Sequence, residues 1–160
     1  MTADDAAAVR PPLPQPGPDT AEFWAACRRH ELRIQRCGAC RRCRFAPRPA
    51  CPSCGALRFR WVRASRFGRV YSWTVIHGPT LPAFQPLVPY AAGVVLLDEG
   101  VFMVGQIRGC APEALREGLR VRVEFDDVTD DIALPHWRVV RERSRSTRAR
   151  AGARRARRLP

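Results

Sequence analysis

The chain has 160 residues, 46% of them hydrophobic, which favours one domain of ordinary size or a small domain with an attached module. Its formal net charge is +13, and all 28 basic residues are arginine. Much of this charge is local, because residues 141–160 hold nine arginines and a single acid, Glu142. A high net charge therefore does not by itself place the chain among nucleic-acid-binding proteins.

Two stretches are candidates for a targeting or membrane segment. Residues 1–18 start with acidic side chains and continue rich in proline, so they predict a disordered leader and not a signal peptide. Residues 70–97 carry no charge, but a membrane helix is excluded by four prolines: Pro79, Pro82, Pro86 and Pro89. We expect a cytoplasmic protein without a membrane span.

A short amphipathic segment follows the leader. Asp19 or Thr20 is a candidate helix cap, and the predicted helix occupies residues 19–31. Phe23, Trp24 and Cys27 fall on one side of it. Such a stripe packs against a core or docks on a partner protein.

Two Cys-x-x-Cys pairs, Cys37/Cys40 and Cys51/Cys54, are separated by ten residues. Two residues between cysteines let both sulfurs of a tight turn face one ion, and an intervening hairpin brings the second pair to the same place. Cys43 also lies three positions after Cys40, so Cys40/Cys43 is an alternative first pair. Disulfides are disfavoured because nothing points to export.

Four thiolates predict a structural Zn²⁺ site, since a full set of protein ligands leaves no position for a substrate. The same spacing is compatible with iron in a rubredoxin-like site. Alternating residues at 32–36 and 58–63 read as strands that enter and leave the metal turns. The sequence thus predicts a rubredoxin-like zinc ribbon at residues 32–63.

The remainder of the chain is predicted to be mainly β. Strands are expected at 68–77, 90–98, 101–107, 119–125 and 134–140, with one or two helical turns at 111–118. Three strands, a short helix and two strands form the order of a five-stranded OB-fold barrel, which we place at residues 64–140. Residues 141–160 have almost no large apolar side chain and predict a disordered basic tail.

The connection from Gly78 to Pro89 is long and apolar. It carries Leu81, Phe84 and Leu87 among its prolines and has no charge. Such a loop either plugs the barrel or docks on a partner, and its length favours docking.

No catalytic constellation is visible in the sequence. His30, His77 and His136 are far apart and none is accompanied by an identifiable nucleophile, and Cys110 has no motif around it. A single-stranded nucleic-acid-binding OB-fold is the alternative function. Residues 93–97 and 101–107 of the second and third barrel strands offer only one aromatic residue, Phe102, and no basic residue, so this alternative relies on RNA binding by the tail.

The combined pattern resembles the DUF35 family, the Zn-ribbon domain-containing OB-fold proteins associated with acyl-CoA metabolism. The resemblance covers about residues 23–140. It rests on Phe23-Trp24, the cysteine pairs with Pro47-Arg48 between them, the segment Gly68-Arg-Val-Tyr-Ser-Trp-Thr-Val, and Gly118 before Val121-Arg-Val-Glu-Phe. One departure is Arg41, which stands where the family often has glycine.

The resemblance implies Cys37, Cys40, Cys51 and Cys54 as the zinc ligands. It also implies a non-catalytic accessory subunit that binds a thiolase-like, aldolase or hydratase enzyme and helps retain its CoA ester. Under this hypothesis, one docking surface comprises the ribbon and the amino-terminal helix, and another comprises the barrel and its proline loop. The candidates for binding the phosphates of CoA are Arg42, Arg44 and Arg48.

Overall fold

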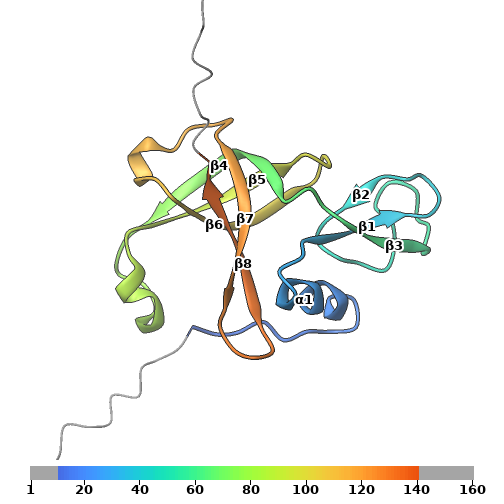
Figure 1. The fold of residues 1–160 in the computed structure, drawn as a ribbon, viewed down its shortest axis with the longest axis horizontal. Coiled ribbons are helices and arrows are strands. Elements are labelled where there is room, and N and C mark those ends of the chain that lie inside the picture. Colours follow the sequence, from blue (N-terminus) through green and yellow to red (C-terminus); the bar gives the residue numbers. More distant parts are fainter. Residues whose placement is uncertain (1–10, 141–160) are drawn as a thin grey trace, which may run out of the picture.

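The computed structural model describes residues 11–140, which form a small three-stranded sheet and a five-stranded closed barrel with one helix packed beside them (Figure 1). The basic tail at residues 141–160 and the first ten residues lie outside the described residues. Within 11–140, no helix has the length and apolar character needed to cross a membrane. The mainly β class with one amino-terminal helix is confirmed.

Helix α1, Ala21–Arg28, is shorter than predicted. It ends at Arg28 because His30 adopts a left-handed backbone with a φ of 56°, which turns the chain out of the helix. The prediction of a side-chain cap was wrong, since the Thr20 hydroxyl accepts the N–H of Gly17 instead of a helix amide. Phe23 and Cys27 are buried, which fixes the apolar side of α1 against the rest of the protein.

The ribbon sheet contains β1 (Arg33–Cys37), β2 (Cys43–Arg44) and β3 (Phe59–Arg63) in the antiparallel order β2-β1-β3. Strand β1 is central, so its end carries Cys37 directly into the first metal turn. A three-residue connection, 64–66, leads from β3 to the barrel.

The barrel contains β4 (Phe67–Ile76), β5 (Tyr90–Leu97), β6 (Phe102–Arg108), β7 (Arg120–Asp127) and β8 (Ala133–Val139). It closes in the order β4-β5-β6-β8-β7, with β7 returning to β4. The β6–β8 pair is parallel and all other pairs are antiparallel. This is the predicted OB-fold topology, in which the third and fifth strands close the barrel.

Two connections between barrel strands contain short 3₁₀ helices. The 111–118 segment forms one helical turn, η2 (Pro112–Ala114), within the predicted one or two, and the turn ends because Leu115 returns to extended backbone. The proline loop contains an unpredicted 3₁₀ helix, η1 (Pro82–Leu87), in which no residue is buried. Leu81 and Leu87 are 62% and 47% exposed, so neither plugs the barrel.

The barrel core is built from alternate residues of the strands. Its members are buried apolar side chains: Val70, Val95, Leu97, Met103, Ile107, Val121, Val123 and Trp137. Trp137 is fully buried and lies against Gly105, where a Cβ atom would come within 2.9 Å of its Nε1. The glycine is therefore required for the indole to fill the barrel interior.

Candidate metal centre and neighbouring surfaces

The four predicted ligands Cys37, Cys40, Cys51 and Cys54 are brought together at the tip of the ribbon, with all four sulfur atoms within 4.8 Å of one another. The Sγ atoms of Cys37 and Cys54 are 3.7 Å apart, as are those of Cys40 and Cys51. Ligands about 2.3 Å from a tetrahedral zinc lie about 3.8 Å from each other, so the spacing fits this ion. The donor set has the geometry of a closed four-thiolate site.

Backbone N–H groups donate hydrogen bonds to the cysteine sulfurs and favour their thiolate form. The N–H of Ser53 lowers the pKa of the Cys51 thiol to about 6, and the N–H of Ala39 donates to Cys37 and lowers its pKa. The N–H of Arg42 acts in the same direction on Cys40, but burial and the neighbouring thiols outweigh it and raise that pKa to about 11. Four thiolates crowded at this distance thus need a cation before all can ionise.

Cys43 is not part of this cluster. It starts β2, pairs with Arg36 across the sheet and packs half-buried against the apolar core. Burial raises the pKa of its thiol, which keeps it protonated. The geometry therefore excludes Cys43 from the group of four sulfurs and favours the register that begins at Cys37.

Arg44 has a different role from the one suggested by the sequence. It is buried, its Nε donates to the side-chain oxygen of Gln35 at 2.6 Å, and its Nη2 donates to the Arg48 carbonyl at 2.9 Å. Its guanidinium also lies 4.9 Å from the Phe59 ring centre. The prediction that Arg44 meets a phosphate was wrong, because these contacts tie the hairpin between the two cysteine pairs to β1. Arg42 and Arg48 are exposed.

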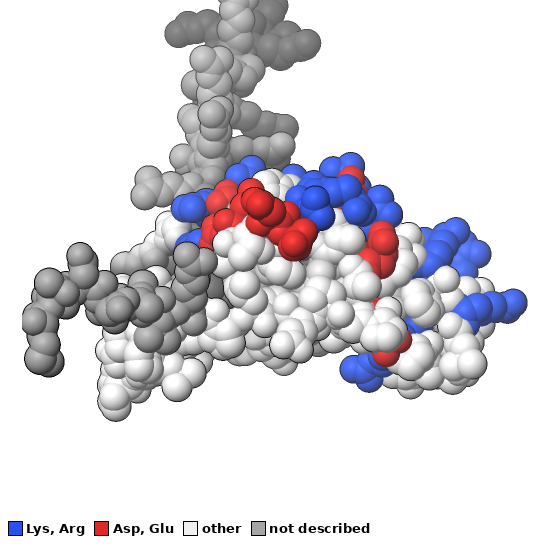
Figure 2. Space-filling model, turned by 90° about the horizontal axis from the view of Figure 1, so that it is seen from below, with Lys and Arg blue, Asp and Glu red and all other residues white. Residues whose placement is uncertain are grey.

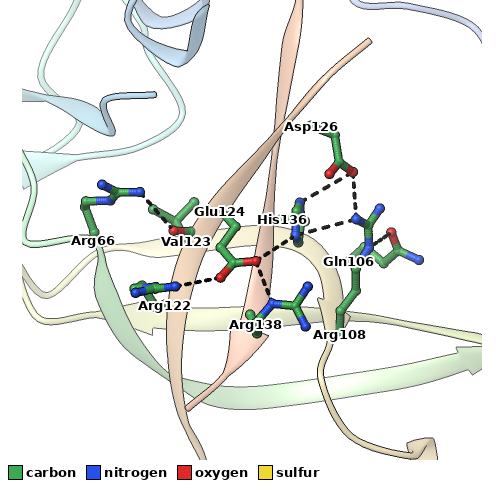
Figure 3. A network of polar contacts seen from close by, with 9 residues as sticks. All are labelled: Arg66, Gln106, Arg108, Arg122, Val123, Glu124, Asp126, His136 and Arg138. Carbon is green, nitrogen blue, oxygen red and sulfur yellow. Dashed lines mark hydrogen bonds and ion pairs between the residues drawn. The ribbon is translucent and has the colours of Figure 1, made fainter. Parts of the chain in front are cut away.

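A second polar cluster lies where β7, β8 and β6 meet (Figure 3). Glu124 binds Arg138 at 2.5 Å and Arg122 at 2.7 Å, which lowers its pKa to about 2. His136 is buried between Arg108 and Asp126, and burial lowers its pKa. This network balances charge across neighbouring strands.

The other two histidines are separate from this network. The ring of His30 stacks on Phe125 with 5.4 Å between centres and its Nε2 lies 2.9 Å from Asp127. His77 follows β4 next to the proline loop. Within residues 11–140, none of the three histidines is hydrogen-bonded to a serine or cysteine side chain. Burial raises the pKa of the Cys110 thiol.

Two family models match the chain. Residues 24–60 match the rubredoxin-like zinc ribbon domain of ChsH2, and residues 61–126 match its C-terminal OB-fold domain. A DUF35 domain-containing scaffold protein of Methanothermobacter thermautotrophicus is 30% identical over 115 residues, which cover 71% of this chain and 86% of the relative. The chain belongs to the DUF35 family. The resemblance read from the sequence is thereby confirmed.

Larger relatives contain a DUF35-like part. A protein of Thermomonospora curvata named "Probable enoyl-CoA hydratase alpha subunit" is 36% identical over 127 residues, 79% of this chain. The present chain spans only 39% of that relative's length. Among solved structures, a chain of the "Ltp2-ChsH2(DUF35) aldolase" has a TM-score of 0.72 and 35% identity, covering 79% of this chain and 98% of that one.

The chain departs from the DUF35 pattern at Arg41, and the structure shows the backbone conformation that this residue adopts in the first metal turn. Arg41 follows Cys40 with a φ of 66°, and Gly55 follows Cys54 with a φ of 72°. Both metal turns therefore need a left-handed residue, which glycine adopts without the steric cost that arginine bears. The first turn keeps its position at this cost and does not move to Cys43.

Sequence reasoning missed a group of exposed apolar side chains on the barrel. Tyr71 and Phe102 pack edge to face with 5.0 Å between ring centres and are 53% and 48% exposed. They come from β4 and β6, which are adjacent to β5 and not to each other. The uncharged run at residues 70–97 was the available signal, but strand pairing was needed to bring these residues together.

Proposed function

We propose that this DUF35 chain is a non-catalytic accessory subunit of an enzyme complex that acts on acyl-CoA esters. The observation that carries the proposal is the match to nearly the whole DUF35 chain of a solved aldolase assembly at 35% identity. The likeness to an enoyl-CoA hydratase alpha subunit supports an acyl-CoA ester as the class of substrate. The partner, a thiolase-like, aldolase or hydratase enzyme, supplies the reacting groups.

The four-cysteine cluster binds a structural Zn²⁺ in this proposal. The ligands are Cys37, Cys40, Cys51 and Cys54, and the ion stabilises a segment whose three short strands bury little apolar surface. Reduced thiols held for a metal fit a cytoplasmic location. The ion holds the two turns together, so that the ribbon keeps one shape when the partner binds.

The exposed arginines of the ribbon help to retain the CoA ester. Residues 32–63 contain nine arginines and no acidic residue. Arg42 and Arg48 are exposed close to the metal turns and are suited to phosphate groups. Arg44 is excluded from this role by its buried contacts.

Single-stranded nucleic acid is the second candidate, favoured by the same arginines and by the exposed Tyr71–Phe102 pair. A nucleic-acid platform combines stacking rings with cations that follow the phosphates. Strands β4, β5 and β6 contain only two arginines, Arg69, which pairs with Leu96, and Arg108 at the end of β6. The exposed rings therefore fit a protein partner better than a nucleic acid.

The test is a mild pull-down of the full tagged chain from its native cells, with mass spectrometry, zinc analysis and nucleic-acid absorbance on one sample. We expect a stoichiometric acyl-CoA enzyme and about one zinc per chain. RNA that survives high salt without such an enzyme would overturn the accessory-subunit proposal and support nucleic-acid binding.

A further inference from the structure

The outer face of β5 and β6 is apolar although it is exposed. On β4, the outward side chains paired with β5 are Arg69, Ser72 and Thr74. Along β5, Ala91, Gly93, Val95 and Leu97 point into the barrel, so Ala92, Val94 and Leu96 belong to the outer side. Strand β6 contributes Phe102 and Val104, and a bulge in β4 adds Tyr71. We call these six residues, Tyr71, Ala92, Val94, Leu96, Phe102 and Val104, the apolar sheet face.

This face lacks the alternation of a sheet with one solvated side. An antiparallel strand that faces water normally places polar residues outward, whereas strands covered on both sides are apolar throughout. Val101–Ile107 contains only one polar side chain, Gln106, and β5 contains none except the Tyr90 hydroxyl. The composition is thus that of a sheet covered on its outer side as well.

Charge distribution agrees with this interpretation. In the view of Figure 2, charged side chains gather along one side of the molecule and over the ribbon, while a broad area beside them is uncharged. The uncharged area extends to the lobe formed by the η1 loop, at the left of Figures 1 and 2. Phe84 stacks on Tyr90 at 6.4 Å between ring centres, which attaches that loop to the first residue of β5.

Val104 contributes to the lining of two adjoining hollows. One, of about 320 Å³, is formed with the small side chains of β4 and β5, Ser72, Thr74 and Ala92. The other, of about 360 Å³, continues past Val104 to Trp24 of α1 and Phe45 of the ribbon. Val104 is 68% exposed on the ridge between them. Hollows of this kind receive anchoring side chains at protein interfaces.

The charges of the chain distinguish between two possible partners for this face, a second copy of the chain and a different protein. The second hollow leads to the ribbon, whose segment 32–63 has nine arginines and no acid. A second copy of the chain seated here would bring another ribbon with nine arginines and no acid toward the first. A different protein, with an apolar patch bordered by acidic side chains, matches both features.

We propose that the apolar sheet face is the docking site for the acyl-CoA enzyme subunit, with Val104 at its centre and the ribbon arginines placed to meet acidic side chains of the partner. This inference rests on the proposed function. It assigns the partner to the outer side of the barrel sheet, which no sequence motif marks.

Val104→Arg places a charge at the centre of the face and should lower affinity for the enzyme subunit by at least about 100-fold, because an unpaired charge would be buried on docking. Val128→Arg is the matched control, since Val128 is also exposed, at 41%, but lies next to the β7–β8 turn. Its affinity should stay within about threefold. Tyr71→Arg, on another strand, should repeat the effect of Val104→Arg.

The enzyme subunit that co-purifies with the wild-type chain is produced separately, and binding is measured by calorimetry with full-length zinc-loaded variants. Circular dichroism and zinc content establish that each variant is folded. If the wild type binds no acyl-CoA enzyme, the proposed function fails. If the wild type binds and folded Val104→Arg and Tyr71→Arg bind equally well, only the docking face is overturned. Wild-type dimers abolished by Val104→Arg, with enzyme binding kept, would assign the face to a second copy.

Discussion

Cys40 and Cys43 lie three positions apart and have opposite environments. The sulfur of Cys40 is 3.7 Å from that of Cys51, whereas Cys43 packs against the apolar core. The turn after Cys40 separates them, because left-handed Arg41 directs the chain back into β2. One residue thus determines which cysteines face the candidate metal.

Replacing one cysteine from each environment tests the ligand set. Cys51→Ser should remove bound zinc and the ordered ribbon, with a loss on the order of 10 kcal/mol of metal-linked folding energy for that segment. Cys43→Ser is the control and should keep about one zinc per chain. Zinc content by atomic emission and ribbon folding by NMR measure both. Full zinc retention by Cys51→Ser, or zinc loss by Cys43→Ser alone, would contradict the assignment.

The barrel interior accommodates one large side chain, the indole of Trp137. Trp137 of β8 fills the interior, and Gly105 on β6 leaves the space for its ring. The neighbouring outer positions of β6 are Phe102 and Val104, so a single strand shapes both the core and the proposed docking face.

Gly105→Ala should destabilise the barrel by about 1–3 kcal/mol, because the added methyl group meets the Trp137 indole and forces it to move. Gly17→Ala is a suitable control, since a Cβ atom there has no neighbour within 4 Å. Urea unfolding followed by tryptophan fluorescence gives both values. Equal stability of the two variants would show that the core accommodates the methyl group.

At the scale of the molecule, charged and uncharged surfaces are segregated. Ion pairs concentrate on β7 and β8, whereas the outer side of β5 and β6 is left apolar. The network around Glu124 and His136 couples barrel stability to pH. Both groups have a lowered pKa in the folded state, so the unfolded chain binds protons more readily than the folded barrel. Ionised Glu124 therefore stabilises the barrel at neutral pH, whereas buried His136 adds nothing there and costs stability only when acid would protonate it.

The free energy of unfolding should therefore fall as pH decreases from about 6.5, first through His136 and then, below the ordinary Glu pKa of 4.5, through Glu124 until about pH 2. Glu124→Gln should cost about 1 kcal/mol at pH 7, after allowance for solvent screening, and almost nothing near pH 2. Glu113→Gln, in η2, is the control and should follow the wild type. A pH-independent effect of Glu124→Gln would contradict the role of its ionisation.

The sequence alone determined the fold class, the order of the barrel strands and the family. Cysteine spacing and strand alternation are local patterns, and each reports a structure that forms within a few residues. The sequence also placed Cys37, Cys40, Cys51 and Cys54 as a candidate set, although Cys40/Cys43 remained an alternative first pair.

Only the tertiary structure decided what depends on contacts between distant residues. It separated Cys43 from the sulfur cluster, buried Arg44 against Gln35, and exposed Leu81 and Leu87 instead of enclosing them. It also joined Tyr71 to Phe102 across β5. Side-chain burial and the composition of a surface follow from strand register and barrel closure, which no short segment of the sequence encodes.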